Sequence, residues 1–143
     1  MLLVDYLALH QRATDTDVDR IVVTRAAPAP LAATGYEAES GSWGGGATIQ
    51  SASNALGGRA VGTMTATGAY TQVNVNGGTG GPASLVIRFA NGYAESRSLS
   101  LYVNGVRQRQ LAFAPTGSWN TFVDSAPIAV VLAAGSNSVR IQH

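Results

Sequence analysis

Glu37 and Glu39 are the residues whose types and spacing first suggest chemistry. They are two positions apart, so on a β-strand both side chains project to the same face. Neighbouring carboxylates repel each other, and a cation such as Ca²⁺, which takes roughly six to eight oxygen ligands, would neutralise them. The alternative is a solvated acidic pair at the edge of a sheet. The spacing alone leaves both interpretations open.

The same pair could serve as the acid and base of a glycosidase, a class of enzyme that works with two carboxyl groups. Two acids on one strand face do not flank a cleft, however, and the chain has only two histidines, His10 and His143. A nucleophile activated by histidine therefore has no evident base, and the absence of cysteine removes thiol catalysis. The sequence predicts a protein without catalytic residues.

The composition of the chain limits the classes of partner that it can be expected to bind. Its 143 residues fit about one domain, and its nine basic residues, all arginine, and eight acidic residues give a formal net charge of +1. No basic tract is present to neutralise a phosphate backbone, so nucleic acid is not expected. No apolar run approaches the roughly 18 residues of a membrane-spanning helix, so no membrane partner is expected either. We interpret the apolar residues 1–10 as a strand rather than a signal peptide, because they lack a basic start and contain Asp5.

The elements that must position these residues are predicted to be strands. Short alternating segments separated by glycine-rich turns are typical of an all-β sandwich or barrel. Apolar and polar residues alternate in the segments 84–89, 98–103, 128–132 and 139–141. Asn104-Gly105 predicts a type I′ turn, because both of its central positions need positive φ, and therefore a hairpin between 99–104 and 106–113.

An Ala/Pro stretch, residues 25–34, divides a short N-terminal piece, 1–24, from the main body, 35–143. The N-terminal piece holds two strand-like runs, 2–9 and 18–24, and some 24 residues are too few to form a core alone. We therefore expect this piece to pair with the main body, or with a neighbouring copy, within one sandwich domain that covers residues 1–143.

Six segments of the main body resemble, in order and spacing, successive motifs of family 6 and family 35 carbohydrate-binding modules. They are Tyr-Glu-Ala-Glu-Ser (36–40), Gly-Gly-Arg-Ala-Val-Gly (57–62), Ile-Arg-Phe-Ala-Asn-Gly (87–92), Leu-Tyr-Val-Asn-Gly (101–105), Pro-Thr-Gly-Ser-Trp-Asn-Thr-Phe (115–122) and Leu-Ala-Ala-Gly-Ser-Asn-Ser-Val-Arg-Ile (132–141). The resemblance implies a jelly-roll β-sandwich of the galactose-binding-like type. It also implies an extracellular, non-catalytic module that binds a polysaccharide or oligosaccharide.

A structural Ca²⁺ follows from the same resemblance, since such modules hold it with two glutamates of the first strand and an aspartate of the last. Carried over residue by residue, the ligands are Glu37, Glu39 and Asp19. Asp19 shares a period-two register with Ile21 and Val23, so it is the one acid on an otherwise apolar face. Such an acid is expected to meet a cation at the edge of the sandwich.

For the sugar, the resemblance implies an aromatic platform, and Trp119 in the Gly-Ser-Trp loop is the matching residue. A loop favours exposure of this side chain, and a core tryptophan is the alternative. Asn120, beside it in the same loop, is a further sugar-binding candidate. Tyr93, next to a glycine-rich turn, is a reserve platform, as is Trp43, for which packing in the core or at a sheet edge is the alternative.

Two polar positions depart from the pattern of the family. Asp17 stands where the family has asparagine, so it accepts hydrogen bonds but donates none, and it could help to hold a second Ca²⁺ that bridges to the ligand. Arg59 stands where family 6 members place a second aromatic residue. It could pair with the carboxylate of a uronic acid, and a solvated surface charge is the alternative.

The last strand of the family, of the form Asn-Leu-Asp-Tyr-Ile, is found at the other end of this chain. Asp17-Val-Asp-Arg-Ile-Val-Val23 resembles it, and residues 4–9, with Asp5 as the aspartate, are a weaker candidate. This order predicts a circularly permuted module in which residues 25–34 connect the last strand of the family to its first. The alternative is a piece of a tandem array whose copies exchange this strand as a homo-oligomer, including a structural or adhesive repeat without sugar binding.

Overall fold

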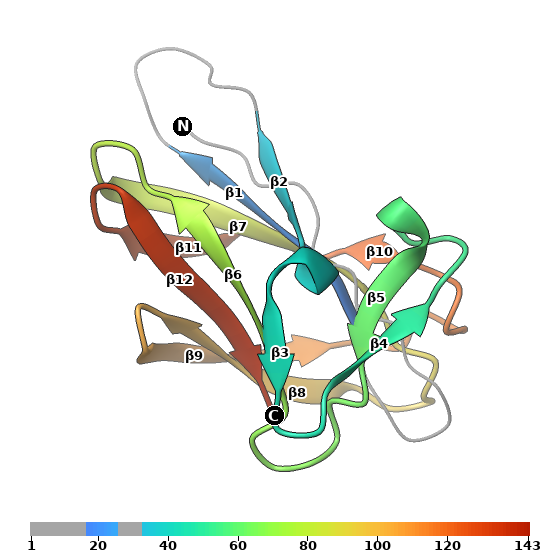
Figure 1. The fold of residues 1–143 in the computed structure, drawn as a ribbon. Coiled ribbons are helices and arrows are strands. Elements are labelled where there is room, and N and C mark those ends of the chain that lie inside the picture. Colours follow the sequence, from blue (N-terminus) through green and yellow to red (C-terminus); the bar gives the residue numbers. More distant parts are fainter. Residues whose placement is uncertain (1–16, 26–32) are drawn as a thin grey trace.

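The computed structural model describes residues 17–25 and 33–143, and for Asp17, Thr24 and Arg25 it describes the backbone only. These residues form two antiparallel sheets that face each other as a β-sandwich (Figure 1). The predicted all-β sandwich is confirmed. The strand-like run 2–9, including Asp5, and most of the predicted connection between the two parts lie outside the described residues.

The first sheet has seven strands, with the N-terminal strand of the described chain in its middle. Its members are β1 (Asp17–Arg25), β2 (Thr34–Glu37), β4 (Thr48–Ser51), β5 (Arg59–Gly62), β7 (Gly81–Ala90), β10 (Val123–Asp124) and β11 (Ile128–Leu132). β1 pairs with β7 on one side and with β2 and β5 on the other. β4 extends the sheet beyond β5, and β10 and β11 both pair with β7. The pairing of β1 with the main body therefore occurs within one chain.

The second sheet has five strands, in the order β3-β6-β12-β8-β9. They are β3 (Ser42–Gly44), β6 (Tyr70–Asn76), β8 (Arg97–Val103), β9 (Val106–Phe113) and β12 (Ser136–Gln142). β8 and β9 form the predicted hairpin, in which Asn104 and Gly105 have φ values of 51° and 78°. Both values are positive, as a type I′ turn requires, so this prediction is confirmed.

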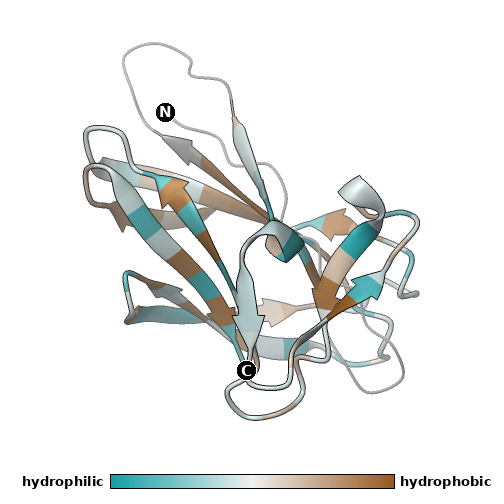
Figure 2. Cartoon of the chain, viewed as in Figure 1, coloured by the Kyte–Doolittle hydropathy of each residue, from teal (hydrophilic) through white to brown (hydrophobic). Residues whose placement is uncertain are grey.

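The core lies between the sheets and is built from one face of each strand. Buried residues follow the predicted alternation: Leu85, Ile87, Phe89, Leu99, Leu101, Val103, Ile128, Val130, Leu132, Val139 and Ile141. Figure 2 shows the matching alternation of brown and paler segments along β6 and β12. Phe89 of β7 meets Phe113 of β9 edge to face, with ring centroids 4.9 Å apart, so the contact joins the two sheets. Val86, on the face of β7 expected to be more solvated, is buried as well.

Two short 3-10 turns, η1 (Ala38–Ser40) and η2 (Leu56–Gly58), interrupt the strands and help to form the site described next. Each is only three residues long. Among residues 17–25 and 33–143, no helix is long and apolar enough to cross a membrane.

Candidate metal centre and sugar platform

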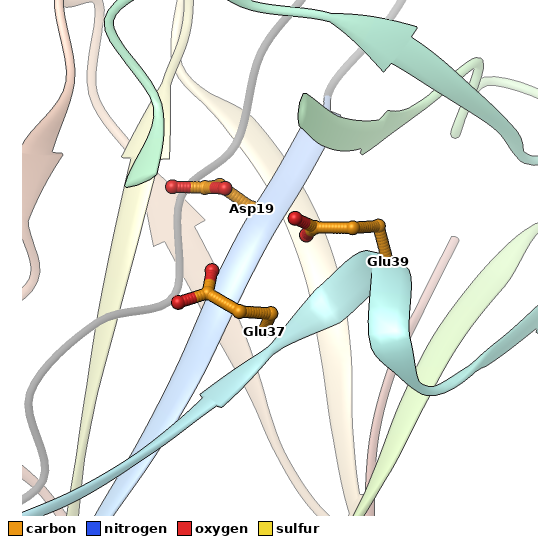
Figure 3. Close-up of side chains that lie close together, drawn as sticks. All are labelled: Asp19, Glu37 and Glu39. Carbon is orange, nitrogen blue, oxygen red and sulfur yellow. The ribbon is translucent and has the colours of Figure 1, made fainter. Parts of the chain in front are cut away.

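Asp19, Glu37 and Glu39 point toward one another in an acidic cluster where β1, the end of β2 and η1 meet (Figure 3). One carboxylate oxygen from each residue lies within 4.8 Å of those of the other two. The residues come from separate elements: Asp19 from β1, Glu37 from the end of β2, and Glu39 from η1. The structure thus brings together the three side chains that the sequence predicted as metal ligands.

Two local irregularities aim these carboxylates at one another. The pairing of β1 with β7 shifts register between Val18 and Arg20, so Asp19 is the extra residue of a β-bulge, a feature that redirects side chains. Glu39 does not lie on the strand with Glu37, as the two-residue spacing predicted. Instead β2 ends at Glu37, and the chain turns through η1, which returns the Glu39 carboxylate to the same side.

Burial dominates the electrostatics of the acidic cluster. Burial, together with the carboxylates of Glu39 and Glu37, raises the pKa of Asp19 to about 9. Burial likewise raises the pKa of Glu39 to about 7. It also raises the pKa of Glu37, although Arg20, whose Nε lies 3.1 Å from Glu37 Oε1, opposes that change. Three acids at this position therefore resist becoming charged together.

The donor atoms of the cluster fit a hard cation. Within the part of the chain that the structure describes, Asp19 Oδ1, Glu37 Oε2 and Glu39 Oε2 are each buried and accept no hydrogen bond. Buried carboxylate oxygens without partners are costly, and a cation that prefers oxygen ligands, such as Ca²⁺, would satisfy all three. The other oxygen of Asp19, Oδ2, accepts a hydrogen bond from the Leu56 backbone N–H at 3.2 Å, which fixes the orientation of the carboxylate.

In a chelating buffer, we expect the melting temperature to fall as the pH rises from about 4 to about 9. The folded state keeps protons on Asp19 and Glu39 that the unfolded chain, with ordinary pKa values of 3.8 and 4.5, releases earlier. The stability contributed by these protons is complete below the unfolded values and is lost as the pH rises through the folded values. Thermal unfolding across this range checks the slope, which the double variant Asp19→Asn/Glu39→Gln should flatten. A melting temperature that rises with pH would contradict the expectation.

Trp119 lies on the loop between β9 and β10, half-buried, with its indole against the backbone of Gly92. A Cβ added to Gly92 would lie only 2.2 Å from Cδ2 of the indole, so a residue without a side chain is needed beneath the ring. The Tyr93 ring meets the indole edge to face, with centroids 5.2 Å apart. The Arg97 guanidinium lies 4.2 Å from the centroid of the Tyr93 ring. The structure therefore brings Tyr93 and Trp119, both predicted sugar-binding residues, together.

Hydrogen bonds fasten the loop of Trp119 on both sides. Before the tryptophan, Asn91 N–H donates to Thr116 Oγ1 at 3.0 Å and Thr116 N–H donates to the Asn91 carbonyl at 2.8 Å. After it, Asn54 Nδ2 donates to the Asn120 carbonyl at 2.9 Å. Sequence reasoning missed these contacts. The Asn-Gly pair after a predicted strand was a usable signal for Asn91 and Gly92, whereas nothing near Asn54 in the sequence points to Asn120.

The remaining candidates are dispersed around these two centres. Arg59 begins β5 and is exposed, and its charge opposes the burial that raises the pKa of Glu39, so it lies beside the acidic cluster. The backbone of Asp17 pairs with that of Ala90, two residues before the Gly92 against which the Trp119 indole lies. The side chain of Asp17 is outside the described part. Trp43 lies on β3 opposite Thr71 and is 38% exposed, so it is not a core residue.

A two-sheet sandwich that carries a cluster of three acids and an aromatic loop has the features of a ligand-binding module. The family model described as carbohydrate binding module (family 6) matches residues 37–143. The chain belongs to this family.

Proteins similar to this chain include enzymes and a carbohydrate binding module. A 1,6-alpha-glucosyltransferase from Sporosarcina globispora is 34% identical over 110 residues, which cover 76% of this chain and 8% of that protein. A family 35 carbohydrate binding module from Clostridium thermocellum has a TM-score of 0.68 and 33% identity, over 75% of this chain and 84% of that one. An exo-beta-1,3-galactanase from Phanerochaete chrysosporium, solved with beta-1,3-galactotriose, has a TM-score of 0.71 and 32% identity, over 79% of this chain and 26% of that one. The chain thus spans a small part of the enzymes that it matches.

Proposed function

We propose that this chain is a non-catalytic module that binds a polysaccharide or oligosaccharide outside the cell and uses Trp119 as its stacking platform. The observation that carries the proposal is the position of the Trp119 indole, one face of which lies against Gly92. The C–H face of a pyranose ring packs well on an aromatic surface, and the half-exposed indole of Trp119 lies on a loop, where it can offer such a contact. Asn120 and Tyr93 supply polar groups near the platform. A pocket of about 260 Å³ lies beside Tyr93, and its lining includes Ala94 and the polar residues Glu95 and Arg97.

The acidic cluster supports a resident Ca²⁺ with a structural role in this module. Asp19, Glu37 and Glu39 would hold the ion, which would neutralise three carboxylates that repel one another when charged. Arg59, beside the cluster rather than at the platform's aromatic contact, is the weaker of the predicted sugar-binding residues. Asp17, whose backbone lies next to Ala90, is a candidate for the polar contact of the sugar and for a second, ligand-bridging Ca²⁺.

The strand order of the module is proposed to be circularly permuted relative to its family. The family match begins at residue 37, after β1, yet β1 occupies the middle of the first sheet between β7 and the strands β2 and β5. This pairing within one chain supports closure of the sandwich by its own N-terminal strand rather than by a neighbouring copy. A monomeric mass in solution is the expected result.

Affinity gel electrophoresis on a panel of polysaccharides tests the proposed function. The panel should include an α-1,6-glucan and a β-1,3-galactan, because of the activities named for the relatives, together with xylan, mannan and a uronic-acid polymer. Retardation by at least one neutral or acidic glycan is the expected outcome, and turnover of chromogenic glycosides is not expected. A chain that migrates unchanged on every gel, with and without Ca²⁺, would contradict the proposal.

A further inference from the structure

One short loop touches both the acidic cluster and the segment that carries Trp119. Residues 52–58 connect β4 to β5 and fold back on themselves. Ala52 N–H donates to the Gly58 carbonyl at 2.9 Å, and Gly58 N–H donates to the Ala55 carbonyl at 3.1 Å. These bonds make the loop a compact unit, so its two ends are not free to move independently of each other.

At the acidic cluster, the loop contacts two of the three carboxylates. The Leu56 backbone N–H donates to Asp19 Oδ2 at 3.2 Å. The next residue, Gly57, has a φ of 73° and lies so close to Glu39 that an added Cβ would be 3.1 Å from Oε1. The position of the loop is therefore tied to the positions of the Asp19 and Glu39 carboxylates.

At the platform, the same loop contacts the residues that follow Trp119. Asn54 Nδ2 donates to the Asn120 carbonyl at 2.9 Å. A small buried cluster of three alanines lies next to Asn54 along the chain, and Phe122 packs against it. Its members are Ala52, Ala55 and Ala60. One polar bond and one apolar contact thus join the loop to residues 120–122, and the polar bond reaches the residue adjacent to the indole.

We propose that Asn54 is a positioning residue for the Trp119 platform, and that residues 52–58 couple cation binding at the acidic cluster to glycan binding. This inference rests on the proposed function. A bound cation draws the Asp19 and Glu39 carboxylates toward itself. When the cation is absent, this constraint is lost, and Leu56 and Gly57 move with the two side chains that they contact. The Asn54 bond carries this displacement to Asn120 and so changes the position of the indole. Because such coupling is reciprocal, the glycan also strengthens cation binding by the same factor.

The test compares glycan dissociation constants in Ca²⁺ and in a chelator, with the glycan that retards the wild-type protein most. The wild type is expected to bind on the order of tenfold more tightly in Ca²⁺, within the usual range of coupling between sites. Asn54→Ala and Asn54→Asp remove the donor, the second with little change of shape, and should bring this ratio close to one. Asn74→Ala, the same change at an exposed position of β6, is the control and should keep the wild-type ratio.

A second measurement separates positioning from damage to the fold. The rise in melting temperature on adding Ca²⁺ should be the same in both Asn54 variants as in the wild type, because all three carboxylates are retained. A wild-type protein that binds the glycan equally well in Ca²⁺ and chelator would overturn the coupling and leave the proposed function standing. Variants that keep the wild-type ratio would overturn the role of Asn54. A wild type that binds no glycan in either condition would overturn the proposed function and this inference with it.

Discussion

Trp119→Ala is expected to weaken glycan binding by at least about 30-fold, which would abolish retention in an affinity gel. Truncating a central aromatic contact typically costs about 2 kcal/mol or more, which corresponds to that factor. The stability of the module should change little, because the indole is half-buried on a loop and its main aromatic contact, with Tyr93, contributes about 1 kcal/mol. Affinity electrophoresis and thermal unfolding of the same samples measure both quantities.

Trp43→Ala provides the matched control. Trp43 is the other tryptophan of the chain, lies on β3 of the second sheet and is also partly exposed. Its replacement should leave retention unchanged, since the proposed platform is built from the loop of Trp119 and the turn at Gly92. If Trp119→Ala binds as the wild type does, or if only Trp43→Ala loses retention, the platform is assigned to the wrong residue.

Calcium is expected to raise the melting temperature on the order of 10 °C, and Asp19→Asn is expected to remove this effect. A cation that binds only the folded state stabilises it by about 4 kcal/mol when its free concentration is roughly a thousandfold above Kd, and a chain of this size converts that energy into such a shift. Asparagine keeps an acceptor for the Leu56 N–H but removes a charged ligand. Calorimetry with added Ca²⁺ and with a chelator measures the shift.

The order of stabilities should reverse between the two conditions. In Ca²⁺, Asp19→Asn should melt below the wild type, because it has lost a ligand. In chelator it should melt at or above the wild type, because it replaces an acid whose charged form is disfavoured by burial and by two neighbouring acids. Asp124→Asn, which removes an acid of β10 outside the cluster, should keep the full calcium response. A wild-type melting temperature that ignores Ca²⁺ would refute the metal centre.

Much of the sandwich could be predicted because its determinants are local. Alternation along single strands identified the core residues of β7, β8 and β11, and Asn104-Gly105 determined the turn of one hairpin. The pairing of β1 with β7 depends on distant residues, and only the resemblance of residues 17–23 to a strand of the family suggested it. Val86 shows the same limit: it lies on the face of β7 expected to be more solvated, yet it is buried, because its burial depends on residues outside its own strand.

The acidic cluster was predictable as a set of residues but not as a geometry. The period of two correctly placed Asp19 on a buried face, yet the bulge that makes it the extra residue of β1 arises from pairing with β7. Glu39 reaches the cluster through a 3-10 turn that the two-residue spacing did not indicate. At the proposed platform, Trp119 was suggested by the resemblance of its loop to that of the family, whereas Gly92 and Asn54 contact it or its neighbour across long stretches of sequence.

The central place of β1 also bears on how the chain folds. Asp17 pairs with Ala90 and Arg25 with Ala83, so the ladder between β1 and β7 can form only after more than half of the chain has been synthesised. Folds dominated by such distant pairings fold slowly, because a long loop must be closed before its contacts stabilise the product. Asp19 belongs to this same strand, whereas Glu37 and Glu39 are close neighbours along the chain. β1 also pairs with β2, its neighbour along the chain, so the three carboxylates of the acidic cluster can meet before the ladder with β7 closes, whereas the bulge at Asp19 forms only when β1 joins β7.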